Sequence, residues 1–188
     1  TLAGLAEPGA LTAFAYALKL FLLPVMMLFA PLATVLLPRF TDTPDDRLLM
    51  ESAIAMMLVL SLATLAAGLS SGDAIARLIY FRGAMTEEGM MAVTAMARWM
   101  FIAIPFAALE LIGAAALNAR RQTGRVMLHA MIAFALSSGL ALLRPDLVMP
   151  AFVLFYVCLA ALHLAALKLD AMARRMRIEV SRWNTATA

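Results

Sequence analysis

Five apolar stretches dominate the chain, and their length is the property that most restricts its fold. They lie near residues 11–37, 52–69, 90–117, 126–143 and 148–167. An α-helix of about 20 apolar residues crosses the ~30 Å hydrocarbon layer of a membrane. A backbone in lipid must satisfy its own hydrogen bonds, and the sequence lacks the short alternating segments of barrel strands. We therefore expect an all-α integral membrane protein with about five transmembrane helices.

The composition supports this class and excludes several others. Only 14% of the residues are charged, whereas a soluble domain carries about 25%. The sequence contains no glycine-rich phosphate loop, nucleophile elbow or metal-ligand spacing. We therefore expect that the protein is not an enzyme and that it binds no cofactor and no metal. Its basic residues lack the interleaved aromatics of nucleic-acid binding. The single cysteine, Cys158, predicts a buried, inert thiol rather than a disulfide.

We expect two regions along the chain, a transmembrane helical domain over residues 1–170 and a basic cytoplasmic tail over 171–188. The tail could lie against anionic headgroups or be a solvated end. The start at Thr1, without an initiator methionine or a signal peptide, indicates a fragment or a processed piece of a longer protein.

The distribution of basic residues predicts the orientation. If the chain crosses the membrane five times, ten of the lysines and arginines that flank the spans lie on one side of the membrane and three on the other. Basic residues favour the cytoplasmic side, so the first helix would enter from outside and the C-terminus would be cytoplasmic. The basic residues of the richer side are Arg39, Arg47, Arg120, Arg121, Arg125, Lys168, Arg174, Arg175, Arg177 and Arg182.

Prolines predict where the helices begin, bend and end. The segment Thr43–Asp46 combines a capping residue, a proline and two acids, so the second helix should begin near Pro44. Pro38 should end the first helix, and Pro24 and Pro31 should kink it.

Two charges lie deep within the apolar runs and are the main candidates for function. Lys19 is the only charge in the first run, and a buried charge in a membrane usually faces a protein interior or a water-filled cavity. It could instead reach the outer interface by extending its side chain. Tyr16 lies one turn away and could shape the same site. Glu110 could pair with a cation, act as a proton-coupled carboxylate, or simply reach the interface. Lys19, Tyr16 and Glu110 are the candidate substrate-binding residues.

Three arginines are expected near the outer interface, namely Arg77, Arg82 and Arg98. The first two belong to the segment 72–89, whose spacing of apolar residues suits a short helix lying in the interface. His129 and His163 are single residues near predicted helix ends, where we expect each to be packed or interfacial.

Three stretches of the chain together resemble a known family. Residues 9–40 carry Gly, Tyr-Ala-x-Lys-Leu, Leu-Pro and Thr-Val-Leu-Leu-Pro-Arg in that order. Residues 79–86 read IYFRGAMT, and residues 117–123 read LNARRQT. In order and spacing these resemble the eighth transmembrane helix, an external loop and a later turn of the MurJ/MviN lipid II flippases, which belong to the multidrug/oligosaccharidyl-lipid/polysaccharide exporter superfamily.

The resemblance implies a fold and a mechanism. The chain would correspond to helices eight to twelve of a flippase with two helical lobes, in the bacterial inner membrane. Lys19 matches a position that is usually an arginine lining the central cavity, where it would meet the pyrophosphate of the lipid carrier. The chain departs from the family pattern at Asn118, Gln122 and Val126.

The implied partners are a polyprenyl-pyrophosphate-linked glycan, membrane lipids, and a missing N-terminal lobe or other membrane subunits. The lobes would flip the glycan by alternating access, and the chain alone would not transport. Two alternatives stay open: a small accessory or structural subunit of a larger membrane complex, and a diverged polysaccharide or drug exporter.

Overall fold

The structure is a computed structural model that describes residues 9–43, 46–81 and 85–186. These residues form helices and short connections, with no strand among them. The elements are α2 (Ala10–Pro24), the π-helical turn η1 (Val25–Phe29), α3 (Ala30–Asp42), α4 (Arg47–Tyr80), α5 (Glu87–Ala119), α6 (Thr123–Leu143), the 3₁₀ turn η2 (Pro145–Leu147) and α7 (Val148–Ala186).

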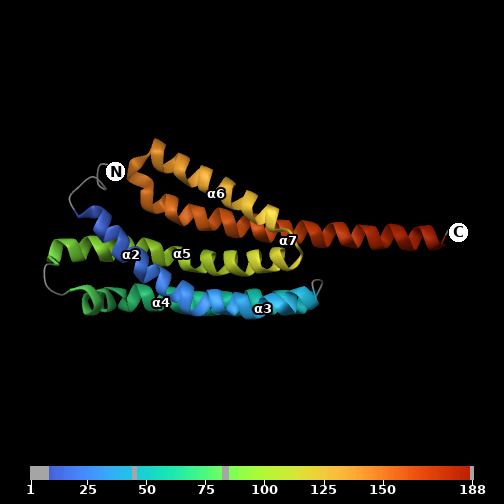
Figure 1. The fold of residues 1–188 in the computed structure, drawn as a ribbon, viewed down its shortest axis with the longest axis horizontal. Coiled ribbons are helices and arrows are strands. Elements are labelled where there is room, and N and C mark those ends of the chain that lie inside the picture. The colour runs from blue at the N-terminus through green and yellow to red at the C-terminus, as the bar shows by residue number, and fades with distance from the viewer. Residues whose placement is uncertain (1–8, 44–45, 82–84, 187–188) are drawn as a thin grey trace.

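The expected five transmembrane helices are confirmed. Five helical segments are long and apolar enough to cross a membrane, the first of them being α2, η1 and α3 in one continuous run. The helices run back and forth along one long axis, so the α3–α4 and α5–α6 connections lie at one end (Figure 1). The α4–α5 and α6–α7 connections lie at the other end. The last part of α7 extends beyond the rest of the bundle.

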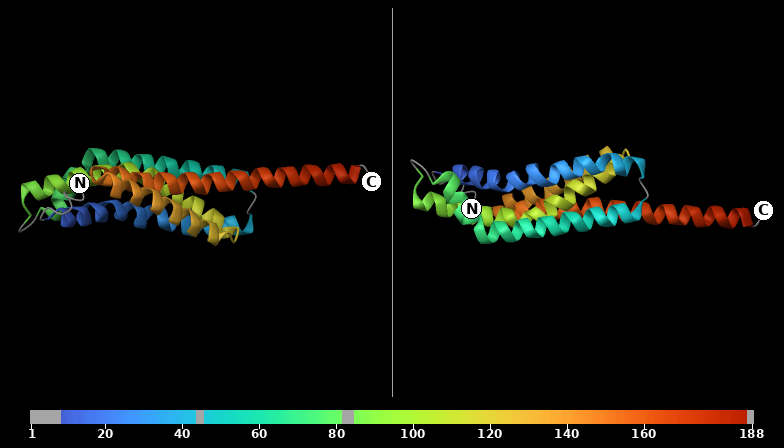
Figure 2. Two further views of the ribbon diagram at one scale, coloured as in Figure 1. Left: turned by 90° about the horizontal axis from the view of Figure 1, so that it is seen from above. Right: turned by 90° about the horizontal axis from the view of Figure 1, so that it is seen from below.

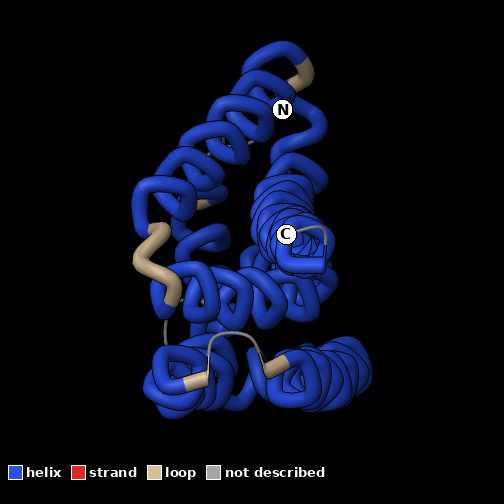
Figure 3. The backbone as a smooth tube through the Cα atoms, turned by 90° about the vertical axis from the view of Figure 1, so that its right-hand side faces the viewer, coloured by secondary structure: helices blue, strands red, loops and turns tan. Residues whose placement is uncertain are grey.

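Helix α5 is the centre of the bundle. In its most apolar stretch 61% of the residues are buried, against 17–28% in the other four spans. It packs against α2, α3, α4 and α7, while α6 packs mainly on α7. Although α3 and α4 overlap in Figure 1, the two views of Figure 2 place them on opposite sides of the bundle. The end-on view of Figure 3 shows the same stacking, with the C-terminal helix towards the viewer.

Two glycines let α4 and α5 approach closely. A Cβ at Gly68 would lie 2.8 Å from the Phe101 ring, and one at Gly72 would lie 2.7 Å from it. The aromatic ring of α5 therefore lies over a glycine surface of α4, in the manner of small-residue packing between membrane helices. This contact holds the second half of α4 against the core, with Ala76 also buried there.

The same packing corrects the expected helix at the outer interface. Helix α4 continues without a break to Tyr80, so the first part of the segment 72–89 belongs to a transmembrane helix. Two other limits were also wrong. The second helix begins at Arg47, because the Asp46 carboxylate accepts a hydrogen bond from the Leu49 N–H at 3.0 Å and so acts as its N-cap. Pro38 does not end the first helix, which continues to Asp42 because Phe40 is buried in the core.

The first span changes helical type between two of its prolines. Pro24 ends α2, η1 follows with the wider π-type turn, and Pro31 lies in the first turn of α3. The Ala30 N–H donates to the Val25 carbonyl, one residue further back than in an α-helix. Prolines remove backbone donors and π-turns commonly occur beside such gaps. The irregularity thus lies where the sequence predicts kinks.

Candidate functional site

Lys19 lies on α2 beside two tyrosines. Its Nζ is 5.3 Å from the centre of the Tyr16 ring, within the range of a cation–π contact. Tyr16 in turn packs on Tyr80 at the end of α4, with 4.7 Å between the ring centres. The expected proximity of Lys19 and Tyr16 is therefore present. Tyr80, 64 residues away in the sequence, completes the group.

The lysine lies on a face of α2 that the described part of the chain leaves exposed. Thr12, Ala15, Lys19 and Leu23 recur every three or four residues and are all exposed. Lys19 is about 14 Å from the start of α2 at 1.5 Å per residue. A lysine at the centre of a bilayer costs roughly 2.5–3.5 kcal/mol when it faces lipid. This face consequently suits a cavity or a second protein surface better than lipid.

Glu110 lies on α5 in a different part of the bundle. Its side chain is half-buried and lies close enough to Tyr156 of α7 for the two groups to interact electrostatically. The Tyr156 ring packs against Phe21 of α2, with 5.3 Å between ring centres. In the described part of the chain the Glu110 carboxylate has no ion-pair partner. Glu110 is therefore a half-buried acid near Tyr156, with no counter-charge among the described residues.

The structure does not bring Lys19 and Glu110 together. Phe21 faces α7 and the surroundings of Glu110, as its contact with Tyr156 shows. Lys19 is two residues earlier, which places it about 200° around an ideal helix. The two deep charges thus face different surfaces, one outward from α2 and one towards the interior between α5 and α7.

Two histidines form a pair that the sequence does not reveal. His129 of α6 and His163 of α7 lie with 5.1 Å between their ring centres. His163 is fully buried, and the Glu110 backbone of α5 lies close to its ring. Gly113 of α5 makes room for it, because a Cβ there would lie 2.8 Å from the His163 Cβ. Both histidines were expected to be packed or interfacial, but only the folded bundle shows that they pack together.

Two of the three arginines expected at the interface link α4 to α5. Arg77 contacts Glu87 at 3.0 Å, and Arg98 forms an ion pair with Asp73. Both pairs are largely exposed and flank a shallow pocket of about 300 Å³ near the α4–α5 connection. Arg82 lies outside the described residues.

At the opposite end, a polar cluster connects α6 and its preceding turn to α7. Asp170 accepts hydrogen bonds from the Gln122 amide at 2.8 Å and from the Arg125 guanidinium at 2.9 Å. Only 17% of the Asp170 side chain is exposed, so this is the least solvated ion pair described here. Within residues 9–43, 46–81 and 85–186, no three His, Cys, Asp or Glu side chains converge as a metal site would require.

Comparison with known proteins gives one match. A family described as lipid II flippase MurJ matches residues 1–181, which is nearly the whole chain. No curated protein and no solved structure matches it.

Proposed function

Because the chain belongs to the MurJ lipid II flippase family, we propose that it forms one side of a cavity through which a lipid-linked glycan crosses the membrane. The observation that carries this proposal is the position of Lys19. The lysine is exposed on α2, well inside a transmembrane span, and on a face that none of the described helices covers. An anionic phosphate would supply a negative charge opposite Lys19, and a second helical lobe would cover this face of α2.

Lys19 would bind the negative headgroup of the lipid carrier. A cation in a low-dielectric cavity attracts phosphate oxygens strongly, and a hydrogen bond to a charged group contributes about 1.5–3 kcal/mol. Tyr16 and Tyr80 would fix the direction of the side chain, because the cation lies over one ring and that ring packs on the other. A lysine keeps the charge of the arginine that the family resemblance implies, but it loses bidentate geometry.

Glu110 would have a different role in the same cycle. It lies between α5 and α7 rather than on the Lys19 face, so we assign it to the interior that must repack when two lobes rock. Tyr156 of α7 lies near enough to interact with it electrostatically, and Phe21 and Phe152 pack on the Tyr156 ring, so a change in this packing would alter the surroundings of the carboxylate. Substrate would then meet Lys19 and not Glu110.

The proposed orientation follows from the two ends of the bundle. The α3–α4 and α5–α6 connections lie at the end of the bundle beyond which α7 projects, and these elements hold most of the basic residues (Figure 1). We place this end at the cytoplasmic side of a bacterial inner membrane. The glycan would enter there and leave past the α4–α5 connection as a second lobe rocks against this one.

The test is a flipping assay with the full-length protein in proteoliposomes that contain lipid II. Lys19→Ala should lower the flipping rate by at least about tenfold, since one hydrogen bond to a charged group is worth about 1.4 kcal/mol or more. Lys19→Arg should keep most of the rate. Leu23→Ala is the matched control, because it lies one turn along the same exposed face and removes no charge. An unchanged rate in Lys19→Ala would remove this residue from the mechanism and favour an interface with another subunit.

A further inference from the structure

Two imidazole rings meet inside the membrane-spanning part of the bundle, where α6 packs on α7. The side chain of His163 on α7 is fully buried and that of His129 on α6 is half-buried, with 5.1 Å between the ring centres. An ionisable side chain inside a membrane is costly, and most such residues serve a function. Neither histidine takes part in the flippase cycle proposed above.

Close packing fixes the position of His163. Gly113 of α5 leaves room for its Cβ, and the Glu110 backbone lies close to its ring. The ring can therefore reach water only if the helices around it separate. A proton on this ring would place a charge in an interior without water, which costs far more than the same charge in water. A protonated His163 consequently favours an arrangement in which water reaches the ring.

Helix α6 is the helix whose movement would admit that water. Only 17% of its most apolar stretch is buried, and its fully buried residues are Ala133 and Ser137, which are both small. Segments with few buried contacts open at a low free energy. His129 is about 9 Å from the start of α6 at 1.5 Å per residue, so water has a short path to the pair from this end of the bundle.

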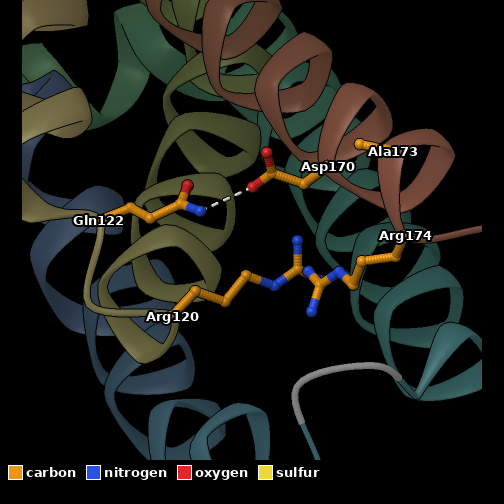
Figure 4. A pocket seen from close by; sticks show the side chains of 5 residues that line it. All are labelled: Arg120, Gln122, Asp170, Ala173 and Arg174. Carbon is orange, nitrogen blue, oxygen red and sulfur yellow. Dashed lines mark hydrogen bonds between the residues drawn. The ribbon is translucent and has the colours of Figure 1, made fainter. Parts of the chain in front are cut away.

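The start of α6 is held to α7 by separate polar contacts. Asp170 of α7 accepts hydrogen bonds from Gln122 at 2.8 Å and from Arg125 at 2.9 Å, beside a pocket of about 320 Å³ (Figure 4). Carboxylates, amides and guanidinium groups do not ordinarily titrate between about pH 5.5 and pH 8. This anchor therefore stays closed in mild acid, and the rest of α6 would move about its first turn.

The charged groups around the histidine pair come from each element packed against it. They are Glu110 of α5, Arg125 of α6, Asp170 of α7 and, at the far end of α6, Asp146 of η2. Arg125 acts on His129 electrostatically and opposes a further positive charge there. Glu110 would lose its charge in acid and become easier to bury, which would tighten the bundle rather than open it. The direction of the change thus separates the histidines from this carboxylate.

We propose that His129 and His163 form a proton-binding site at the α6–α7 interface and that proton binding releases α6 from α7. The open arrangement hydrates the rings and so binds protons more tightly than the closed one, and acid shifts the population towards it. A hydrated imidazole takes up a proton near pH 6.5, so at about pH 5.5 each newly hydrated ring raises the open population about 11-fold. His129 is only half-buried in the closed arrangement, so His163 supplies most of the effect. The site does not involve Lys19 and does not depend on the proposed flippase cycle.

Hydrogen exchange of the full-length protein in detergent micelles tests the proposal. The exchange of the α6 amides is measured at about pH 8 and about pH 5.5, and each rate is divided by the intrinsic rate of an unfolded amide at that pH. The opening of α6 should rise about tenfold in acid. Helix α4 packs mainly on α5 and should change less than about twofold.

Substitutions identify the group that binds the proton. His163→Phe keeps a buried ring and His163→Gln keeps a polar side chain, but neither binds a proton in this pH range, so α6 should open equally at both pH values. Asp146→Asn is the matched control, because it removes a titratable group at the far end of α6 and should keep the rise in acid.

Three results would overturn the proposal. One is an opening of α6 that does not change with pH in the unmodified protein. Another is a rise in acid that persists in both His163→Phe and His163→Gln. The third is loss of the rise in Glu110→Gln, which would identify the carboxylate and not the histidine pair as the group that responds to acid.

Discussion

The contact between Gly113 and His163 yields the sharpest prediction of stability. Gly113 lies on the central helix α5, and a methyl group there would lie 2.8 Å from the His163 Cβ of α7. Ordinary van der Waals contact begins at 3.4 Å, so the two atoms would need to separate by about 0.6 Å. The clashing atom is the first atom of the side chain. A change of rotamer cannot move it, and α5 and α7 must separate instead.

The magnitude follows from two opposing contributions. Overpacking a close contact costs about 1–3 kcal/mol, and a clash with a fixed atom belongs in the upper half of that range. Replacing glycine by alanine within a helix recovers up to about 1 kcal/mol. We expect Gly113→Ala to lower the free energy of unfolding by about 1–2 kcal/mol. Gly139→Ala is the control, because nothing lies within 4 Å of its added methyl group. It should stabilise the protein by about 0.5–1 kcal/mol.

Reversible unfolding in mixed micelles with increasing dodecyl sulfate, followed by far-ultraviolet circular dichroism, measures both variants. Adding His163→Gly to Gly113→Ala removes the clashing Cβ and should restore close approach of the helices. Adding His163→Ala keeps that atom and should not. If Gly113→Ala were as stable as Gly139→Ala, the contact between α5 and α7 would be looser than the structure has it, and the reasoning would fail.

Three further perturbations test other parts of the structure. Gly72→Ala should destabilise the bundle by about 1–2 kcal/mol in the same unfolding assay, because its methyl group meets the Phe101 ring, and Phe101→Leu in that background should recover part of the loss. Arg121→Gly should raise the unfolding midpoint by relieving a left-handed conformation that costs about 1 kcal/mol, and an unchanged midpoint would argue against strain at this turn. The hydrogen bond from Arg144 lowers the pKa of Asp146, so the stability that this carboxylate contributes is present at neutral pH and lost as the pH falls through that lowered pKa. Asp146→Asn should therefore differ from the unmodified protein at neutral pH and match it in acid, and a difference that persists in acid would contradict this cause.

The number of helices, their type and the family could all be predicted from the sequence. Length and hydropathy are local properties of each run, and a bilayer leaves few alternatives to a helix. The predicted ends of the helices were less accurate where tertiary packing determines where a helix ends. Phe40 carries the first helix past Pro38, and the close contact of Gly72 with Phe101 carries α4 on to Tyr80. Neither contact can be read from a single helix.

The contacts between distant residues could not be predicted for a similar reason. Lys19 and Tyr16 are three residues apart and were expected to be neighbours, whereas Tyr80 joins them only because α4 ends beside α2. The pairing of His129 with His163 likewise depends on how α6 lies on α7. Gln122 was noted as a departure from the family pattern, and its partner Asp170 lies 48 residues further along the chain. The Gly68–Gly72 spacing was the one local signal in the sequence that pointed to close helix packing and was missed.

The π-helical turn at Val25–Phe29 also sets the rotation of α3 relative to α2 about the helix axis. Successive residues of an α-helix advance by about 100°, so a turn that holds one extra residue rotates everything after it relative to everything before it. Phe21 before the turn and Phe40 after it are both buried in the same core, while Lys19 faces outward. Deleting a single residue from this turn would restore regular geometry and force a choice. Either Phe40 would leave the core, or Lys19 would turn from its open face towards the bundle. The irregular turn therefore works as a register adjustment, and insertions or deletions here should be far less tolerated than substitutions.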